Sequence, residues 1–218
     1  MSVVAVFGAT GQTGGRVVER LVAAGRDVIA VSRRGGRVSG ATRAASADLA
    51  TASVDELAAL LDGVDAVVFA AAGDPIRVDR DGALRVVDAA ERAGVDRFVL
   101  VTGMGVVRDR PAEYYGGFWG TYFGAKEASE HGLRASSLRW TILQPGELLN
   151  SRGQGRVQLA PTGALPIGAV TRDDVARVAV AALDDDRAAG HTWELVQGTR
   201  SVEDEIERMA EAAHARRR

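Results

Sequence analysis

The fold of this chain is decided near its beginning by the stretch VVAVFGATGQTG, residues 3–14. Val3–Phe7 is a nearly all-apolar run that predicts a buried strand, and the apolar spacing after it predicts a helix over Gly14–Ala24. Glycines between the two let the backbone turn tightly and approach a pyrophosphate, which the amides of the helix N-terminus then face. A G-x-x-G-x-x-G loop between a strand and a helix therefore predicts a dinucleotide-binding unit. The residues expected to contact the dinucleotide here are Gly8, Thr10, Gly11, Gln12, Thr13 and Gly14.

Outward from this unit, strand-like and helix-like segments alternate along the chain. This alternation predicts an α/β fold, a Rossmann-type doubly wound parallel sheet with helices on both faces. Residues 1–218 are predicted to form a single domain, in which about 145–218 form a small part that covers the substrate. Further strands are expected at 27–31, 42–47, 64–70, 97–102, 140–143 and 191–196. Further helices are expected at 53–61, with a Ser53–Glu56 capping box, and at 77–93, 121–134, 173–183 and 202–213.

Composition excludes several functional classes. The net charge of −2 argues against a nucleic-acid or membrane-surface protein, and we interpret Arg216–Arg218 as a helix end. No apolar run approaches the roughly 20 residues of a membrane span. The absence of cysteine excludes disulfides, thiolate metal sites and cysteine nucleophiles. No metal site is expected, because Asp184–Asp186 is typical of a solvated turn. The absence of cysteine also fits a cytoplasmic protein, and no leader is expected before the first strand.

Two arginines follow the second predicted strand. NAD-binding folds usually place an acidic residue there to bind the ribose hydroxyls. Ser32, Arg33 and Arg34 suit a 2′-phosphate instead, because guanidinium binds phosphate in a bidentate fashion. NADP(H) is therefore favoured over NAD(H), the alternative being a solvated basic loop that also includes Arg37 and Arg43. Further along, Asp48 and Leu49 are expected at the adenine edge, and Ala70, Ala71 and Ala72 against the ribose.

The only lysine of the chain is Lys126, among 27 lysines and arginines. It follows Tyr122 by four residues in a predicted helix, so both side chains lie on one helix face. Lysine offers a compact charge on a flexible stem, which the planar guanidinium of arginine does not. This pair is therefore a candidate for catalysis or for ribose binding.

The glycine loop, Tyr122-x-x-x-Lys126 and the segment WTILQPG at residues 140–146 together resemble the atypical short-chain dehydrogenase/reductases. The most similar branch is the NAD(P)H-binding group with NmrA-like and flavin/biliverdin reductase-like members. The resemblance runs from Val3 through the TRDDVA segment, residues 171–176, to Trp193–Gly198. It implies a Rossmann-type domain that binds NADP(H), with the substrate over the nicotinamide beneath a variable C-terminal part. It also places Pro145 at the cofactor.

By this resemblance, Tyr122 exchanges a proton with the substrate, while Lys126 holds the nicotinamide ribose and lowers the tyrosine pKa. An unperturbed phenol titrates near ~10, too high for an efficient base, and a nearby cation favours the phenolate. The chain departs from the family pattern at Gly103, where the catalytic serine commonly falls. Thr102 is the candidate replacement for its hydroxyl and a further cofactor contact. Gln144 also replaces a frequent arginine.

Two functions remain open from the sequence. The first is an NADPH-dependent reductase of a small carbonyl, quinone or flavin-like acceptor, and the second is a non-catalytic NADP(H) sensor of the NmrA-like kind that acts through a protein partner. A sugar-nucleotide epimerase is disfavoured because the part after Asn150 is short. The aromatic residues near Tyr122 either line a pocket for a flat substrate or belong to the core or a subunit contact, such as a homodimer. They are Tyr114, Tyr115, Phe118, Trp119 and Phe123. Tyr114 and Tyr115 are also rival proton donors.

Overall fold

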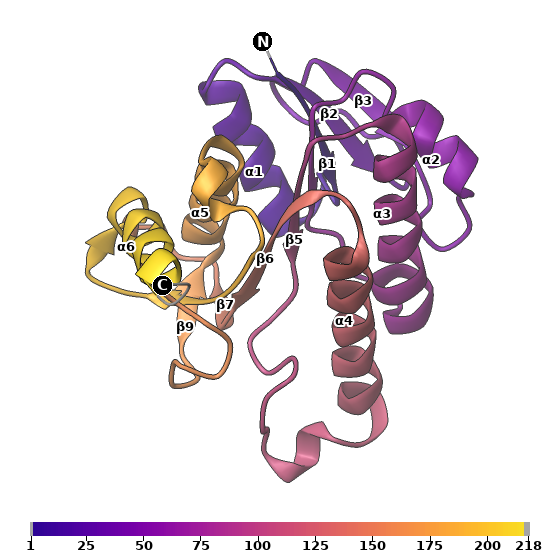
Figure 1. The fold of residues 1–218 in the computed structure, drawn as a ribbon. Coiled ribbons are helices and arrows are strands. Elements are labelled where there is room, and N and C mark those ends of the chain that lie inside the picture. The colour runs from indigo at the N-terminus through magenta and orange to yellow at the C-terminus, as the bar shows by residue number, and fades with distance from the viewer. Residues whose placement is uncertain (1, 216–218) are drawn as a thin grey trace.

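The computed structural model describes residues 2–215, so the interpretation of Arg216–Arg218 concerns residues outside the described part. Within residues 2–215, a nine-stranded sheet carries helices on both of its faces (Figure 1). The strands from β3 to β10 follow the order β3-β2-β1-β4-β5-β6-β10 and all pair in parallel. Beyond β10, strand β8 pairs antiparallel, and β11 completes the edge. The expected doubly wound Rossmann-type fold is confirmed.

The elements have the following bounds. The strands are β1 Val3–Phe7, β2 Asp27–Ser32, β3 Arg43–Ser46, β4 Ala66–Phe69, β5 Arg97–Val101, β6 Arg139–Pro145, β7 Glu147–Leu149, β8 Arg156–Ala160, β9 Ala169–Thr171, β10 His191–Gln197 and β11 Arg200–Ser201. The α-helices are α1 Gln12–Ala23, α2 Val54–Leu60, α3 Asp81–Ala93, α4 Gly117–Ala135, α5 Arg172–Asp184 and α6 Val202–Ala215. A π-helical turn, η1 Pro75–Arg80, precedes α3, and two short 3₁₀ turns are η2 Ala112–Tyr114 and η3 Asp186–Ala188.

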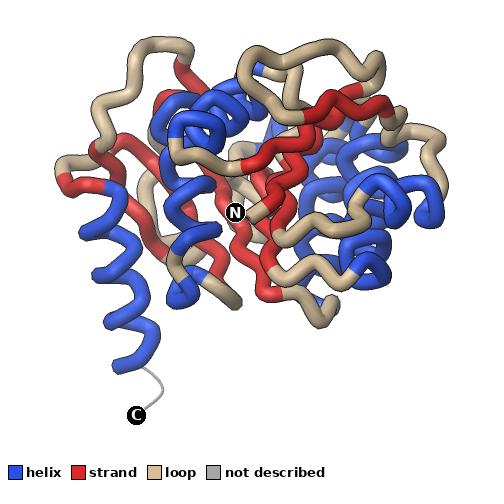
Figure 2. The backbone as a smooth tube through the Cα atoms, turned by 90° about the horizontal axis from the view of Figure 1, so that it is seen from above, coloured by secondary structure: helices blue, strands red, loops and turns tan. Residues whose placement is uncertain are grey.

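Two apolar layers hold the helices on the sheet. Because side chains alternate along a strand, Val4 and Val6 of β1 face the layer of α1, α5 and α6, while Ala5 and Phe7 face that of α2, α3 and α4. Figure 2 shows the strands as a band between these two groups of helices. The near-continuous apolar sequence of β1 reflects burial on both faces.

The crevice relevant to function lies where the strand order reverses. The chain runs from β1 outward to β2 and β3, then returns to the other side of β1 for β4. In open α/β sheets, ligands bind at the carboxyl ends of the strands beside such a reversal. The segment between β5 and α4 and the short strands β7 and β9 lie toward the same lower end of the molecule in Figure 1.

Two adjacent acids at the start of α5 hold a loop of the C-terminal part in place. Asp174 is fully buried and accepts backbone hydrogen bonds from Gln154 and Gly155, and Asp173 accepts one from Gly153. These contacts fix the loop after β7 against the start of α5. Among the described helices, none combines the length and apolarity needed to span a membrane.

Candidate functional site

The glycine loop after β1 requires glycine at two positions for steric reasons. Gly8 has φ +82°, and a Cβ atom there would lie 2.7 Å from the backbone of Ala71. A Cβ atom on Gly14 would lie 2.2 Å from the carbonyl oxygen of Gly8. Both contacts are with backbone that cannot move aside. The loop therefore packs directly on the start of α1 and on the segment after β4.

The N-terminus of α1 is open to an anion. Gly11 caps it without a side-chain hydrogen bond, and its first turn contains no acidic residue. By contrast, α2 begins with the predicted capping box of Ser53 and Glu56. The first amides of a helix lack partners within the helix and carry partial positive charge. This terminus fits a pyrophosphate, and Gln12, Thr13 and Gly14 form its first turn.

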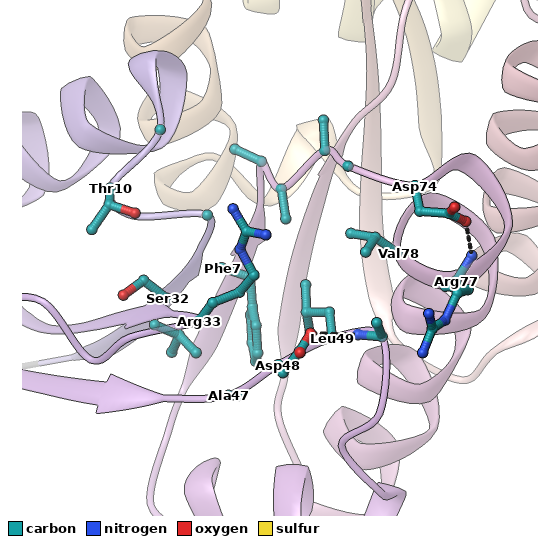
Figure 3. Close-up of a pocket in the computed structure, with 18 residues that line it drawn as sticks. Phe7, Thr10, Ser32, Arg33, Ala47, Asp48, Leu49, Asp74, Arg77 and Val78 are labelled. Atoms are coloured by element: carbon teal, nitrogen blue, oxygen red, sulfur yellow. Dashed lines mark hydrogen bonds between the residues drawn. The ribbon is translucent and has the colours of Figure 1, made fainter. Parts of the chain in front are cut away.

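A pocket of about 440 Å³ opens beside this loop, at the carboxyl ends of β1, β2 and β4 (Figure 3). Its lining combines small and apolar residues, such as Phe7, Leu49 and Ala71, with polar ones, such as Thr10 and Asp74. Of the residues predicted to contact the cofactor, the following line it: Gly8, Thr10, Gly11, Ser32, Arg33, Asp48, Leu49, Ala70, Ala71 and Ala72. The remaining ones lie elsewhere: Gln12, Thr13 and Gly14 in α1, Arg34 just after β2, Thr102 and Pro145 at the ends of β5 and β6, and Lys126 in α4.

The two arginines after β2 differ in position. Arg33 points its side chain into the pocket, whereas Arg34 is not among the lining residues. In the described part of the chain, no ion pair or hydrogen bond engages the guanidinium of Arg33. The neighbouring Ser32 is nearly buried, and its hydroxyl accepts the amide of Gly36 at 3.3 Å. Of the two arginines, only Arg33 therefore lines the pocket.

The wall opposite Arg33 was not foreseen from the sequence. It comes from η1 and the turn before it, which contribute Asp74, Arg77 and Val78. Asp74 caps this turn by accepting the amides of Ile76 and Arg77. The only signal was the pair Asp74-Pro75, which is typical of a helix start. The sequence predicts a helix that begins at Arg77, and this prediction indicates no contact of these residues with the pocket.

A second cluster lies on α4. The half-buried Tyr122 places its hydroxyl oxygen 3.7 Å from where a Cβ atom on Gly103 would stand. The ammonium nitrogen of Lys126 lies 5.6 Å from the centroid of the Tyr122 ring. The structure therefore brings Tyr122, Lys126 and Gly103 together. Gly103 occupies the place from which a serine hydroxyl could reach the phenol.

Lys126 has a partner that the sequence did not reveal. Its ammonium nitrogen lies 2.6 Å from a carboxylate oxygen of Asp79 in η1, and the side chains are 3% and 1% exposed. The other oxygen of Asp79 accepts the amide of Gly73, a residue of the pocket wall, at 3.2 Å. From the sequence alone, Asp79 is only an acid near the start of the helix predicted at 77–93. It instead connects the pocket wall to the catalytic candidate on α4.

The pKa of Tyr122 departs from the expected direction. Burial, and to a lesser extent the negative charge of Asp79, together raise the pKa of this phenol to about 12. The expectation that Lys126 lowers the tyrosine pKa is wrong for this arrangement, because Asp79 neutralises the ammonium and burial disfavours phenolate. Tyr122 is consequently protonated at neutral pH. Such a phenol can donate a proton but is a poor base.

Thr102, the candidate replacement for the missing serine, uses its hydroxyl elsewhere. It is buried and donates to a carboxylate oxygen of Glu130 at 2.6 Å. Glu130 is fully buried and also binds Arg134 and the amide nitrogen of Gln144. Thr102 and Gln144 therefore belong to a polar network between α4 and the sheet. Pro145, at the end of β6, is buried as well, and its carbonyl accepts the amide of Met104.

Aromatic rings extend from Tyr122 to the surface. Phe118 stacks on Tyr122 with centroids 6.2 Å apart, and Trp119 meets it edge-on at 5.8 Å. Phe118 is 61% and Trp119 44% exposed, so these rings form an apolar wall rather than core. Of the rival donors, Tyr115 accepts the backbone amide of Arg110 with its hydroxyl, and Tyr114 packs edge-on against Trp119 and Phe123.

Comparison with known proteins identifies a family and several similar structures. The model of the family described as NAD(P)H-binding matches residues 8–186. The uncharacterized sugar epimerase YhfK of Bacillus subtilis is 30% identical over 215 residues, which cover 94% of this chain and 98% of that protein. The oxidoreductase YlbE from Lactococcus lactis superposes with a TM-score of 0.85 at 23% identity, covering 96% of this chain and 97% of that one. ChuY, an anaerobillin reductase from Escherichia coli O157:H7, gives 0.74 at 26% identity, covering 90% and 97%.

Proposed function

Because the chain belongs to the NAD(P)H-binding family, we propose that it is an NADPH-dependent reductase of the atypical short-chain dehydrogenase/reductase type. Its acceptor is a small, flat molecule such as a conjugated carbonyl, a quinone or a flavin. One observation carries this proposal: the protonated phenol of Tyr122 lies beside Gly103 and Lys126, at the carboxyl edge of the same sheet that forms the pocket.

Different residues of the chain bind different groups of the cofactor. The first turn of α1 receives the pyrophosphate, and Arg33 with Ser32 receives the 2′-phosphate. An ammonium has three N–H donors. Lys126 gives one to Asp79, which leaves two for ribose hydroxyls. The bound nicotinamide supplies a hydride to the acceptor.

Tyr122 supplies the proton that completes a two-electron reduction. Its phenol transfers this proton to the oxygen or nitrogen of the acceptor, and solvent then returns one to the phenolate. The raised pKa suits a donor, because the phenol holds its proton until a basic atom develops beside it. The exposed rings of Phe118 and Trp119 support a flat substrate, and so does the likeness to an anaerobillin reductase.

The proposal is tested by following NADPH oxidation with a panel of carbonyls, quinones and flavins. We expect at least one acceptor to be reduced, and Tyr122→Phe to lower kcat by about 10²–10⁴-fold with little change in NADPH affinity. Phenylalanine keeps the ring contacts and removes only the hydroxyl. If no acceptor consumes NADPH although NADP⁺ binds tightly, the chain is not a reductase of this class.

That outcome would favour the second candidate, a non-catalytic NADP(H) sensor that acts through a protein partner. A specific observation supports it. Gly103 offers no hydroxyl, and the hydroxyl of Thr102 is bound to Glu130. A sensor needs to bind the cofactor but does not need the hydroxyl that is missing at Gly103. Capture of a partner by the NADP⁺-loaded chain, but not by the NADPH-loaded chain, would establish it.

The preference for NADP(H) has its own matched test. Arg33 lines the pocket and Arg34 does not, although the two are adjacent. We expect Arg33→Met to weaken NADPH binding by about tenfold or more and to leave NADH binding nearly unchanged. Arg34→Met should alter neither. Equal losses for the two nucleotides in Arg33→Met would show that this guanidinium does not read the 2′-phosphate.

A further inference from the structure

Two arginines of the segment between β5 and α4 are used in different ways. Arg108 binds Glu194 at 2.7 Å and the carbonyl of Leu165 at 2.9 Å, which ties the segment to the C-terminal part. Arg110 has no such acid. Within the described residues its side chain makes no ion pair or hydrogen bond, and its Nε atom is buried without a partner.

Arg110 is nevertheless held in place. Its guanidinium carbon lies 4.4 Å from the ring centroid of Phe123 and 4.9 Å from that of Tyr115. Its backbone amide donates to the hydroxyl of Tyr115, which closes the loop around it. Contacts with ring faces leave the edge of a guanidinium free for hydrogen bonds. The cation is thus oriented by aromatic rings and keeps its donors for another group.

This cation lies close to the reacting groups. A Cβ atom on Gly105 would stand 3.1 Å from the Phe123 ring and 3.6 Å from Cδ of Arg110. Two residues earlier, a Cβ atom on Gly103 would stand 3.7 Å from the Tyr122 hydroxyl. Residues two apart in a chain are separated by at most roughly 7 Å between Cα atoms. One short glycine segment therefore reaches from the phenol to the stem of Arg110.

We propose that Arg110 binds an anionic group of the acceptor, a carboxylate, phosphate or sulfonate, while the conjugated part of that molecule lies against the rings beside Tyr122. Arg110 is then the residue that determines specificity, and the substrate class narrows to flat anions. This inference rests on the proposed reductase function. The segment also contains Asp109 and Glu113, both exposed and neither paired with Arg110, so a bound anion would not displace an existing ion pair.

Equilibrium binding to the NADP⁺-loaded chain tests this independently of turnover. Three matched pairs serve as probes: riboflavin with FMN, anthraquinone with anthraquinone-2-sulfonate, and azobenzene with its 4-carboxylate. Each pair shares a conjugated system and differs by an anionic group. Binding is read from tryptophan fluorescence, since Trp119 lies beside Tyr122. We expect the anionic member of at least one pair to bind about tenfold more tightly.

Arg110→Met should abolish this difference, because methionine keeps apolar contact with the rings and removes the charge. Arg110→Lys should retain part of it. Arg43→Met, on the far edge strand β3, controls for the loss of one positive charge. Thermal unfolding confirms that each variant is folded.

Three results would overturn the proposal: no preference for any anionic member in the parent chain, equal weakening of both members by Arg110→Met, or the same loss in Arg43→Met. The second would show that the guanidinium only clamps the loop to α4. Failure of the reductase function is separate, because it appears as NADPH that no acceptor consumes, whatever the binding constants are.

Discussion

Replacing Asp79 by asparagine should lower the pKa of Tyr122 and expose the charge of Lys126. The carboxylate now pairs with the ammonium at 2.6 Å, in a place where both side chains are almost inaccessible to solvent. Asparagine keeps the shape and can still accept the amide of Gly73, but it removes the negative charge. The phenol would then lie beside an uncompensated cation, which stabilises phenolate.

The size of this effect follows from the geometry. Lys126 lies 5.6 Å from the centre of the Tyr122 ring. With an effective dielectric constant of about 20, unit charges at that separation interact with about 3 kcal/mol. This corresponds to a roughly hundredfold increase in the ionisation constant of the phenol. The same change leaves a buried ammonium without its partner, which should cost about 3–5 kcal/mol of folding stability at neutral pH.

The assay is an alkaline titration of tyrosinate absorbance. The chain contains three tyrosines, so the signal of Tyr122 is obtained by difference from Tyr122→Phe. Asp81→Asn is the matched control, since Asp81 is a more exposed acid two residues further on that pairs with Arg80. It should leave the titration of Tyr122 unchanged. An unaltered or raised pKa of Tyr122 in a folded Asp79→Asn variant would refute the reasoning.

Further expectations follow from single distances in the site. Gly14→Ala should abolish cofactor binding or folding, because the new Cβ atom would lie 2.2 Å from the carbonyl oxygen of Gly8. Gly15→Ala should be tolerated, because its Cβ atom would lie 3.5 Å from the nearest atom. Calorimetric titration with NADP⁺ distinguishes the two variants. Gly103→Ser should increase kcat for carbonyl acceptors by about tenfold or more, because the new hydroxyl can reach the phenol of Tyr122. Steady-state kinetics measure this, and a decrease in kcat would contradict the prediction. Burial raises the pKa of Tyr122 to about 12, whereas tyrosine in the unfolded chain titrates near about 10. The neutral phenol therefore contributes its full share to folding stability below about pH 10, and this contribution is lost as the pH rises through about 12. Denaturant unfolding at alkaline pH should show this loss, and Tyr122→Phe should lack it.

The sequence predicted the frame of the sheet because local patterns carry that information. Buried parallel strands have continuous apolar runs, and the glycine loop has a fixed place between β1 and α1. The short strands β7, β8, β9 and β11 were missed. They contain two to five residues and form only by pairing with partners distant in the chain, so no local period marks them.

The site was predictable in its components but not in their pairing. Tyr122 and Lys126 stand out because of their spacing, and a buried lysine must have a partner. Which of the 29 acidic residues provides it depends on how η1 packs on α4, and Asp79 has no local mark that separates it from Asp81. Likewise, the sequence does not show that the hydroxyl of Thr102 is already engaged. Its partner, Glu130, lies on a different element that is distant in the chain, so Thr102 looked available for catalysis.

The pairing of Lys126 with Asp79 affects whether Tyr122 acts as a proton donor or as a base. A lysine whose charge is cancelled acts by position, through the donors that it retains, rather than by stabilising phenolate. With a pKa of about 12, Tyr122 is ionised at pH 7 in only about one molecule in 10⁵. Oxidation of an alcohol needs the phenolate as base, whereas reduction of an acceptor needs the phenol as acid. Burial of the phenol, together with the charge of Asp79 on η1, therefore favours proton donation by Tyr122, as the proposed reduction requires. The same carboxylate accepts the amide of Gly73 in the wall of the cofactor pocket, so a single side chain both positions the lysine and couples it to the place where the nucleotide would bind.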